Sequence, residues 1–215
     1  SVTIGQDGGG TGLALWKATG KSIGTVGITL GAVSLSRVSD SIAWVSKFNM
    51  ASSELDTLAI ANGSLYNDLS DGLIINMDDK GYIFLKKHIG IGGSYFDNPH
   101  TCVSLTSDYA YIPANRTINK ASRNLRTSLL PALASPVKVN PDGTLSEDVI
   151  GYFKGLCIQG LDIMVRDQEL SAYEVIINPK QNVLSDSKLK ITVGLVPIGF
   201  ANQIVVNVGY VLAIS

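Results

Sequence analysis

The last 25 residues of the sequence constrain the fold most strongly, because this stretch is long, apolar and free of charge. No Asp, Glu, Lys or Arg occurs from Ile191 to Ser215, a length at which a membrane-spanning helix has to be considered. Apolar side chains nevertheless alternate with other residues through most of this stretch, which is typical of β-strands with one buried face. Pro197 and Asn202 would also be costly inside a hydrocarbon layer. We therefore predict two strands, over residues 188–196 and 203–212, and no membrane helix.

The two predicted strands need partners for their backbone hydrogen bonds. The connection from Pro197 to Asn202 is short, so we expect an antiparallel hairpin in an isolated subunit, with the residues beyond Tyr210 frayed. In the alternative arrangement the second strand is exchanged into a neighbouring copy, and residues 203–215 form an inter-subunit arm. The alternating apolar positions of this strand are candidate interface residues: Ile204, Val206, Val208, Tyr210 and Leu212.

Helical and strand patterns interleave along the rest of the chain. Leucines recur on one side of residues 115–133, between Pro113 and Pro136, and Ser146 is a favourable N-cap for a second helix that runs to Met164. Weaker patterns predict further helices over residues 21–36 and 65–77, and further strands over residues 2–5, 82–85, 89–96 and 173–177. The expected fold class is α/β of the α+β type: a mixed β-sheet with helices packed against it, ending in a terminal antiparallel strand pair.

The size and composition of the chain predict one folded unit with an under-charged surface. A protein of 22.8 kDa can bury about 70% of its unfolded surface and leave roughly 9,600 Å² exposed, so we predict a single compact domain over residues 1–215. Charged residues make up only 16% of the sequence, where about 25% is usual. This deficit favours burial against other copies. The net charge of −1 supplies no general attraction for nucleic acid or for an acidic membrane surface.

Two glycine-containing motifs resemble nucleotide-binding loops but lack a required residue. Gly20, Lys21 and Ser22 match the end of a P-loop, yet Leu15 occupies the position of its first glycine. We therefore expect no phosphate-binding loop, and predict that Gly20 and Ser22 serve the start of a helix. A second glycine-rich run has Tyr95 where the dinucleotide-binding motif needs its last glycine.

The sequence indicates neither a catalytic set nor a metal site. Cys102 and Cys157 lie far apart and lack zinc-ligand spacing. The histidines are His88 and His100, and Asp97 near His100 in sequence is weak evidence for catalysis, because such combinations arise by chance. We predict no enzyme activity, no cofactor and no metal.

A row of cations is the least ordinary feature of the helix predicted over residues 115–133. No Asp or Glu lies in this helix to pair with them. A solvated helix face is the plainer interpretation, and an acidic partner is the alternative, with Asp162, Asp167 and Glu169 of the same or a neighbouring subunit as candidates. The row consists of Arg116, Lys120, Arg123 and Arg126.

The order of these features resembles the contractile tail sheath proteins of phages and related contractile injection systems. Residues 79–87 (DKGYIFLKK) followed by Gly90, and residues 106–109 (TSDY) leading into 115–121 (NRTINKA), are similar to the strand, connection and arginine-containing helix of sheath C-terminal regions. The resemblance continues through the later helix and strands, and covers the chain from Leu65 to its end.

The resemblance implies a mechanical function without catalysis. Such a subunit polymerises with copies of itself into a helical tube around an inner tail tube protein, donates terminal strands to neighbours, and contracts to drive the tube through a target envelope. Baseplate and terminator proteins are implied as further partners, without nucleic acid or membrane insertion. The implied location is the bacterial cytoplasm during assembly and then a virion tail or injection particle. Full sheath subunits are longer than this chain.

Two other functions stay open at the level of sequence. One is a P-loop-like nucleotide-binding enzyme that uses Gly20, Lys21 and Ser22, which ATP binding would reveal. The other is a non-sheath viral assembly protein, which electron microscopy would distinguish from a sheath by the absence of helical tubes.

Overall fold

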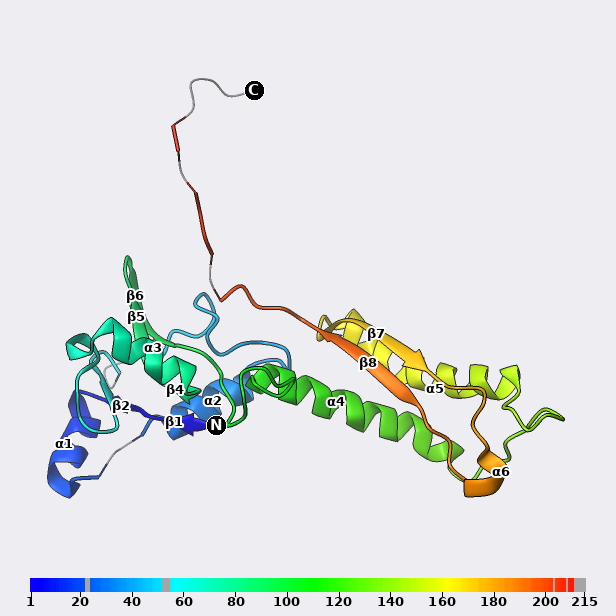
Figure 1. Ribbon diagram of the computed structural model, residues 1–215. Helices are drawn as coiled ribbons and strands as arrows, with labels where there is room; N and C mark the ends of the chain where they lie inside the picture. Colours follow the sequence, from blue (N-terminus) through cyan, green and yellow to red (C-terminus); the bar gives the residue numbers. More distant parts are fainter. Residues whose placement is uncertain (22–23, 52–54, 203, 208, 211–215) are drawn as a thin grey trace.

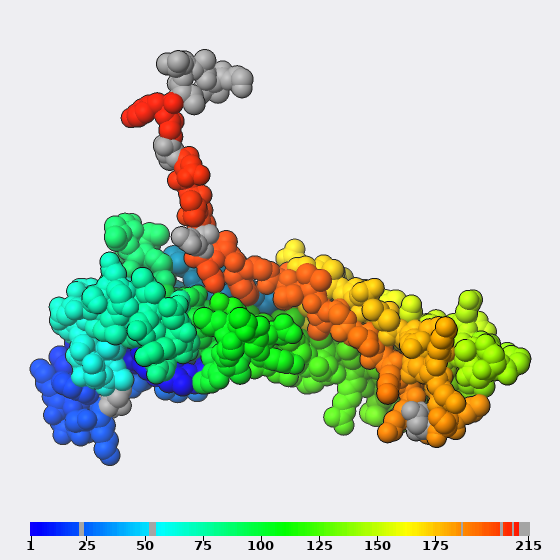
Figure 2. Space-filling view, viewed as in Figure 1, coloured from blue at the N-terminus to red at the C-terminus, as the bar shows by residue number. Residues whose placement is uncertain are grey.

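The computed structural model describes residues 1–21, 24–51, 55–202, 204–207 and 209–210. The body is elongated, and the long helix α4 (Ile112–Leu129) runs from the N-terminal half of the chain toward the opposite end (Figure 1). Residues 204–207 and 209–210 stand away from the body (Figures 1 and 2). Among the described residues, no helix is both long and apolar enough to cross a membrane.

The N-terminal half combines short strands with three helices. Its elements are β1 (Val2–Thr3), β2 (Gly5–Asp7), α1 (Gly10–Thr19), α2 (Val26–Leu35), β3 (Leu58–Ile60), η1 (Tyr66–Asp68), α3 (Asp71–Asp79), β4 (Tyr82–Ile83), β5 (Leu85–His88) and β6 (Ile91–Phe96). The core of this half is built around Ile83, Phe84 and Phe96, all of which are fully buried.

The C-terminal half packs two long helices against one strand pair. After α4 come η2 (Leu130–Ala132), α5 (Glu147–Arg166), β7 (Leu170–Ile176), α6 (Val183–Asp186) and β8 (Thr192–Pro197). Ala121 of α4, Leu161 and Met164 of α5 and Leu170 of β7 form the buried centre of this half. These residues are the inward positions of each element, as the helical and alternating patterns predict.

The α+β fold class is confirmed, but the strands are arranged differently from the expected single mixed sheet. In the described part of the chain they form four two-stranded sheets: β1 with β4 is parallel, whereas β2 with β3, β5 with β6 and β7 with β8 are antiparallel. Strands of two to seven residues that pair only in twos leave many sheet edges without a neighbouring strand.

The predicted C-terminal hairpin is wrong. The strand expected over residues 188–196 is observed as β8, but it pairs with β7, so that Tyr173 lies opposite Leu195 and Ile176 opposite Thr192. Residues 204–207 and 209–210 form no strand. The inward side chains of β7 and β8 already cover α4 and α5, which is why β8 prefers this partner to the sequence that follows it.

The two long helices agree closely with prediction. Ser146 is the N-cap residue of α5, and the acidic residues Glu147 and Asp148 lie in its first turn, where they interact favourably with the helix dipole. Helix α4 begins three residues before its predicted start, because Pro113 lies inside the first turn instead of preceding it. Leu133 is 77% exposed and is therefore not part of the predicted apolar face.

Gly20 ends a helix, which contradicts its predicted role at a helix start. No sequence pattern described above predicts helix α1. Gly20 caps its C-terminus at a positive φ of 64°, and its N–H donates to the carbonyl of Trp16. The next helix, α2, begins only at Val26, and Ser22 lies outside the described residues. A helix instead of a strand therefore precedes the P-loop-like residues.

Gly160 permits the close crossing of α4 and α5. A Cβ atom at this position would lie 2.7 Å from Ser128 Oγ and 3.2 Å from the carbonyl oxygen of Asn124. Asn124 Nδ2 also donates to the Gly160 carbonyl at 3.1 Å. The two helices therefore touch through backbone atoms at this point.

Replacement of Gly160 should destabilise the C-terminal half. We expect Gly160→Ala to lower the free energy of unfolding in urea by about 1–3 kcal/mol, because helix α4 has to move. Gly155→Ala in the same helix is the matched control, since nothing lies within 4 Å of its added Cβ; it should be neutral or stabilise by up to about 1 kcal/mol. Equal effects of the two substitutions would contradict the proposed close contact.

Candidate assembly interface

The four cations of α4 fall into two groups. The side chains of Arg116 and Lys120 have partners within the chain, whereas those of Arg123 and Arg126 are exposed and have no hydrogen-bond or ion-pair partner among the described residues. The row is therefore not a uniform surface, and only the side chains of its second half are left without partners in the described chain.

Arg116 joins α4 to the end of α2. Its Nη1 donates to Ser36 Oγ at 2.7 Å and to the Arg37 carbonyl at 3.2 Å, and its Nη2 donates to the Ser36 carbonyl at 3.3 Å. Ser36 is the C-cap residue of α2, so the guanidinium lies at the negative end of the helix dipole. This contact holds the two halves of the molecule together at the start of α4.

Lys120 has the acidic partner that the sequence suggested. Its Nζ donates to Glu169 Oε1 at 2.6 Å, and the Glu169 side chain is almost fully buried. Glu169 follows α5 directly and precedes β7. The ion pair therefore fixes the turn between α5 and β7 against α4, and Lys120 is accounted for within the subunit.

The β7–β8 pair has one covered face and two outer edges. Tyr173, Val175, Val193 and Leu195 pack toward the helices, while Ile176 and Val196 on the other face are each about half exposed. In the described part of the chain no third strand pairs with either member. An outer strand edge presents unpaired N–H and C=O groups, to which another extended segment can bind.

The Tyr173 side chain links β7 to α5 by a hydrogen bond. Its hydroxyl donates a hydrogen bond to Asp162, the residue considered above as a partner for the basic row. Burial raises the pKa of the Tyr173 hydroxyl, and the hydrogen bond and negative charge of Asp162 raise it further, to about 12.

The C-terminal segment, here residues 198–202, 204–207 and 209–210, is the most exposed apolar part of the molecule. Ile204 is 80% exposed and Val206 is 72% exposed, and the segment stands clear of the body in Figure 2. Beyond Asn202 its described residues make no backbone hydrogen bond within the chain. Val208 and Leu212, two other predicted interface positions, lie outside the described residues.

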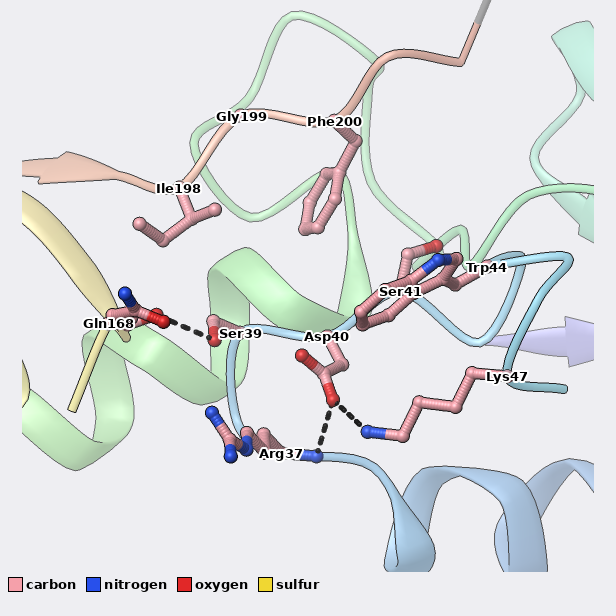
Figure 3. Close-up of a pocket in the computed structure, with 10 residues that line it drawn as sticks. All are labelled: Arg37, Ser39, Asp40, Ser41, Trp44, Lys47, Gln168, Ile198, Gly199 and Phe200. Atoms are coloured by element: carbon pink, nitrogen blue, oxygen red, sulfur yellow. Dashed lines mark hydrogen bonds and ion pairs between the residues drawn. The ribbon is translucent and has the colours of Figure 1, made fainter.

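The C-terminal segment leaves the body across a groove. This exit groove has a volume of about 710 Å³ and lies between the loop 37–47, the turn after α5 and the first residues of the segment (Figure 3). Its walls are formed by Arg37, Ser39, Asp40, Ser41, Trp44, Lys47, Gln168, Ile198, Gly199 and Phe200.

The titratable residues of the N-terminal half form a structural cluster. His100 Nε2 and Asp78 Oδ1 are 2.7 Å apart, and Asn98 Nδ2 donates to the same oxygen at 2.8 Å. Burial alone would raise the pKa of Asp78, but the hydrogen bonds from Asn98 and His100 outweigh it and lower that pKa. Asp97, considered above beside His100, instead forms an ion pair with Lys86, and burial raises its pKa.

This cluster lacks the parts of a catalytic or metal site. No serine, threonine or cysteine side chain hydrogen-bonds to the His100 ring in the described part of the chain. Nor do three or more His, Cys, Asp or Glu residues gather there in a way that could hold a metal ion. The cluster therefore fits a role in joining α3 to the segment after β6.

Sequence patterns missed several contributors to this surface. The exit groove is formed by residues from three separate stretches, none of which has a recognisable motif. Asp78 and Tyr173 were also not singled out, because their partners are distant in sequence. The one available signal was the pair of aromatic residues Trp44 and Phe200 in loop-like stretches, where exposed aromatic side chains are unusual.

The C-terminal half of the chain matches a known protein family. Residues 108–215 match the family described as DUF2586, C-terminal domain. The match covers half of the chain. The chain belongs to this family. The DUF2586 region includes α4, α5, the β7–β8 pair and the C-terminal segment, so it contains every candidate interface residue. No curated protein sequence matches the chain.

Three solved structures share the fold over most of the chain. The sheath complex of an extracellular contractile injection system, PVC, in the contracted state superposes with a TM-score of 0.61 and 16% identity, covering 88% of this chain and 52% of that chain. A chain of the anti-feeding prophage (AFP) baseplate superposes with a TM-score of 0.59 and 15% identity, covering 89% of this chain and 52% of that chain. For the contracted AFP helical sheath the TM-score is 0.57 and the identity 17%, with 84% of this chain and 48% of that chain covered.

These comparisons show a sheath-like fold for the DUF2586 chain. At 15–17% identity they establish the fold alone, and they confirm that part of the resemblance seen in the sequence. The chain spans about half the length of the structures that it matches.

The two groups of cations should differ in their effect on stability. We expect Arg116→Met to lower the free energy of unfolding by about 1–3 kcal/mol, because the partly buried groups at the end of α2 lose a charged donor. Arg123→Met, which removes an exposed arginine from the same helix, should change it by no more than about 0.5 kcal/mol. Urea unfolding of both variants tests this difference, and a larger loss for Arg123→Met would contradict it.

Tyr173 should titrate apart from the other tyrosines. In an ultraviolet titration one of the eight tyrosines should ionise at a pKa of about 12, and Asp162→Asn should move that step toward the ordinary value of 10.0. Because the folded-state pKa is raised, the stabilisation is complete below pH 10 and is lost as the pH rises toward 12. Tyr173→Phe should remove the high step, and its persistence would show that another tyrosine is responsible.

Proposed function

We propose that this DUF2586 chain is a structural subunit that assembles with copies of itself into a contractile, helical sheath. The observation that carries the proposal is the C-terminal segment, which is apolar, extended and without backbone partners beyond Asn202 within the described chain. The same molecule offers the outer edges of β7 and β8. A segment that needs a sheet edge and a sheet with free edges are complementary parts of a self-association.

The direction of this exchange favours an open polymer. The segment leaves β8 of its own chain and points away from the body (Figure 1), so the sheet edge that it joins belongs to another copy. The donor and acceptor surfaces differ, which makes the contact heterologous. Heterologous contacts form closed rings or helical assemblies according to the rotation between copies, and a helical tube is the form that the sheath-like fold supports.

The exposed surface supports extensive burial in an assembly. The isolated chain exposes 13,497 Å², whereas a compact monomer of this mass exposes roughly 9,600 Å². Many of the exposed side chains are large and apolar, including Leu30, Leu35 and Ile204. This excess, together with the low charged fraction, is what a subunit with several neighbours requires.

Contraction in this proposal needs no catalysis. A metastable lattice releases free energy when its subunits rearrange and gain interface, and the strand exchange keeps neighbours connected while they move. We propose an inner tail tube protein, a baseplate and a terminator as partners, assembly in the bacterial cytoplasm, and a final place in a virion tail or injection particle. The nucleotide-binding alternative has little support, because Gly20 ends α1.

Electron microscopy of the full chain at high concentration tests the proposal. We expect helical tubes, in which the β7–β8 sheet of each copy gains strands from other copies. Closed shells would favour the non-sheath assembly protein, and a chain that stays monomeric at all concentrations would contradict self-association. Saturable ATP binding that disappears in Lys21→Ala would favour the enzyme instead.

Removal of the end of the chain should separate folding from assembly. A chain that ends at Asn202 should keep the circular dichroism spectrum and melting temperature of the full chain, because none of the described residues beyond it belongs to a core cluster. It should not polymerise, because it lacks the segment that is proposed to pair with a neighbour's sheet edge. Melting or aggregation of the truncated monomer would show that these residues belong to the core, and normal polymerisation would show that the exchange uses other residues.

Charge reversal at the unpaired end of the basic row should weaken assembly. We propose that Arg123 and Arg126 face an acidic surface of a neighbour or of the inner tube, at roughly 0.2–1 kcal/mol per exposed pair, repeated along the polymer. Arg123→Glu with Arg126→Glu should prevent tube formation without unfolding the monomer. Lys138→Glu with Lys180→Glu makes the same change in net charge at other exposed positions and should assemble. Normal assembly of the Arg123/Arg126 variant at low salt would show that these two residues form only a solvated helix face.

A further inference from the structure

The C-terminal segment is attached to the body by two apolar side chains before it stands free. Ile198 and Phe200 point from the segment into the exit groove, toward Ser39 and the loop that carries Trp44 (Figure 3). The two side chains also line a smaller cavity of about 150 Å³, whose other walls include Pro113 and Thr117 of α4. Phe200 therefore lies between the loop 37–47 and the first turns of α4.

The loop side of the exit groove is held in place by polar contacts. Ser39 Oγ donates to the Gln168 carbonyl at 3.3 Å, and the Arg37 N–H donates to Asp40 Oδ2 at 3.2 Å. Asp40 also forms an ion pair with Lys47, whose Nζ lies 5.5 Å from the centre of the Trp44 ring. Phe200 therefore meets a preformed surface.

Contact between the segment and the body ends soon after this point. Phe200 is 39% exposed, whereas Val205 and Val206 are each 72% exposed. Gly199 lies between the two groove-facing side chains, and nothing is within 4 Å of the position that its Cβ would take. A glycine can adopt a wide range of backbone conformations, so Gly199 itself does not fix the direction in which the segment continues.

We infer that Phe200 is a positioning residue, which fixes the place and the direction in which the C-terminal segment leaves the body. The inference rests on the proposed function, since direction matters when the segment must reach a sheet edge of another copy. A segment whose first residues are already ordered against the body loses less conformational entropy when the rest of it binds to another copy. Removal of the ring should therefore broaden the positions of the free segment and weaken strand exchange.

Distance measurements on the dilute monomer test this directly. Nitroxide labels at Glu174→Cys on β7 and Asn207→Cys on the segment, in a Cys102→Ser background, report the spread of distances between body and segment. Phe200→Ala should broaden this distribution, and Phe200→Leu, which keeps part of the apolar volume, should restore most of its width. The matched control is Val205→Ala, because Val205 lines neither cavity; it should leave the distribution unchanged.

Tryptophan fluorescence gives a second reading at the groove itself. The chain has two tryptophans, so Trp16→Phe leaves Trp44 as the only one. In that background Phe200→Ala should shift the emission to longer wavelength and raise acrylamide quenching roughly twofold, because Phe200 lines the same groove as Trp44 and loss of its ring opens that groove to water. Val205→Ala should change neither signal.

The outcomes separate this inference from the proposed function. An unchanged distance distribution together with unchanged quenching in Phe200→Ala would overturn the role of Phe200, whether or not the chain forms tubes. Broadening in Phe200→Ala in a chain that never polymerises would support the positioning role while the sheath proposal fails. In a chain that does form tubes, Phe200→Ala should need a higher protein concentration for assembly than Phe200→Leu.

Discussion

Backbone hydrogen bonding is the constraint on which the rest of this structure depends. Strands that pair only in twos leave N–H and C=O groups at their outer edges, and the C-terminal segment beyond Asn202 leaves its own groups without partners in the described chain. Water can satisfy these groups in a monomer, but it cannot cover the apolar side chains that accompany them. If one copy supplies the strand and another supplies the sheet edge, the backbone groups gain hydrogen-bond partners and the apolar side chains are covered.

Helix α4 is the element that makes this arrangement mechanically useful. Arg116 fixes its first turns to the end of α2, and Lys120 fixes its middle to Glu169 beside β7. The β7–β8 sheet and the groove from which the segment leaves are therefore attached to the same helix. In the proposed sheath, force applied to a donated strand would be carried through this helix to the N-terminal half.

The sequence predicted the local elements better than their partners. The apolar spacing in 115–133 and the N-cap at Ser146 correctly indicated α4 and α5, because helix formation depends on neighbours along the chain. The alternation around Val193 correctly indicated a strand, but its partner was wrong. Pairing is decided by which face is already covered, and β7 covers α4 and α5 while residues 204–207 do not.

The interface residues were predictable only in part, for a similar reason. The absence of carboxylates in α4 correctly pointed to an acidic partner for its cations, and Glu169 of the same chain is that partner for Lys120. The exit groove has no sequence signature, because Trp44 and Phe200 come together only through the fold. Residues far apart in sequence that share no motif are outside what spacing and composition can predict.

Hydrogen exchange tests the central claim most directly. The amides of residues 204–207 are compared between dilute monomer and assembled tubes, with the buried strand residue Phe96 as an internal reference that stays protected in both. The account predicts rapid exchange of these amides in the monomer and strong protection in the tubes, accompanied by new protection along an outer edge of β7 or β8. Rapid exchange of residues 204–207 in assembled tubes, or protection already present in the monomer, would contradict strand exchange between copies.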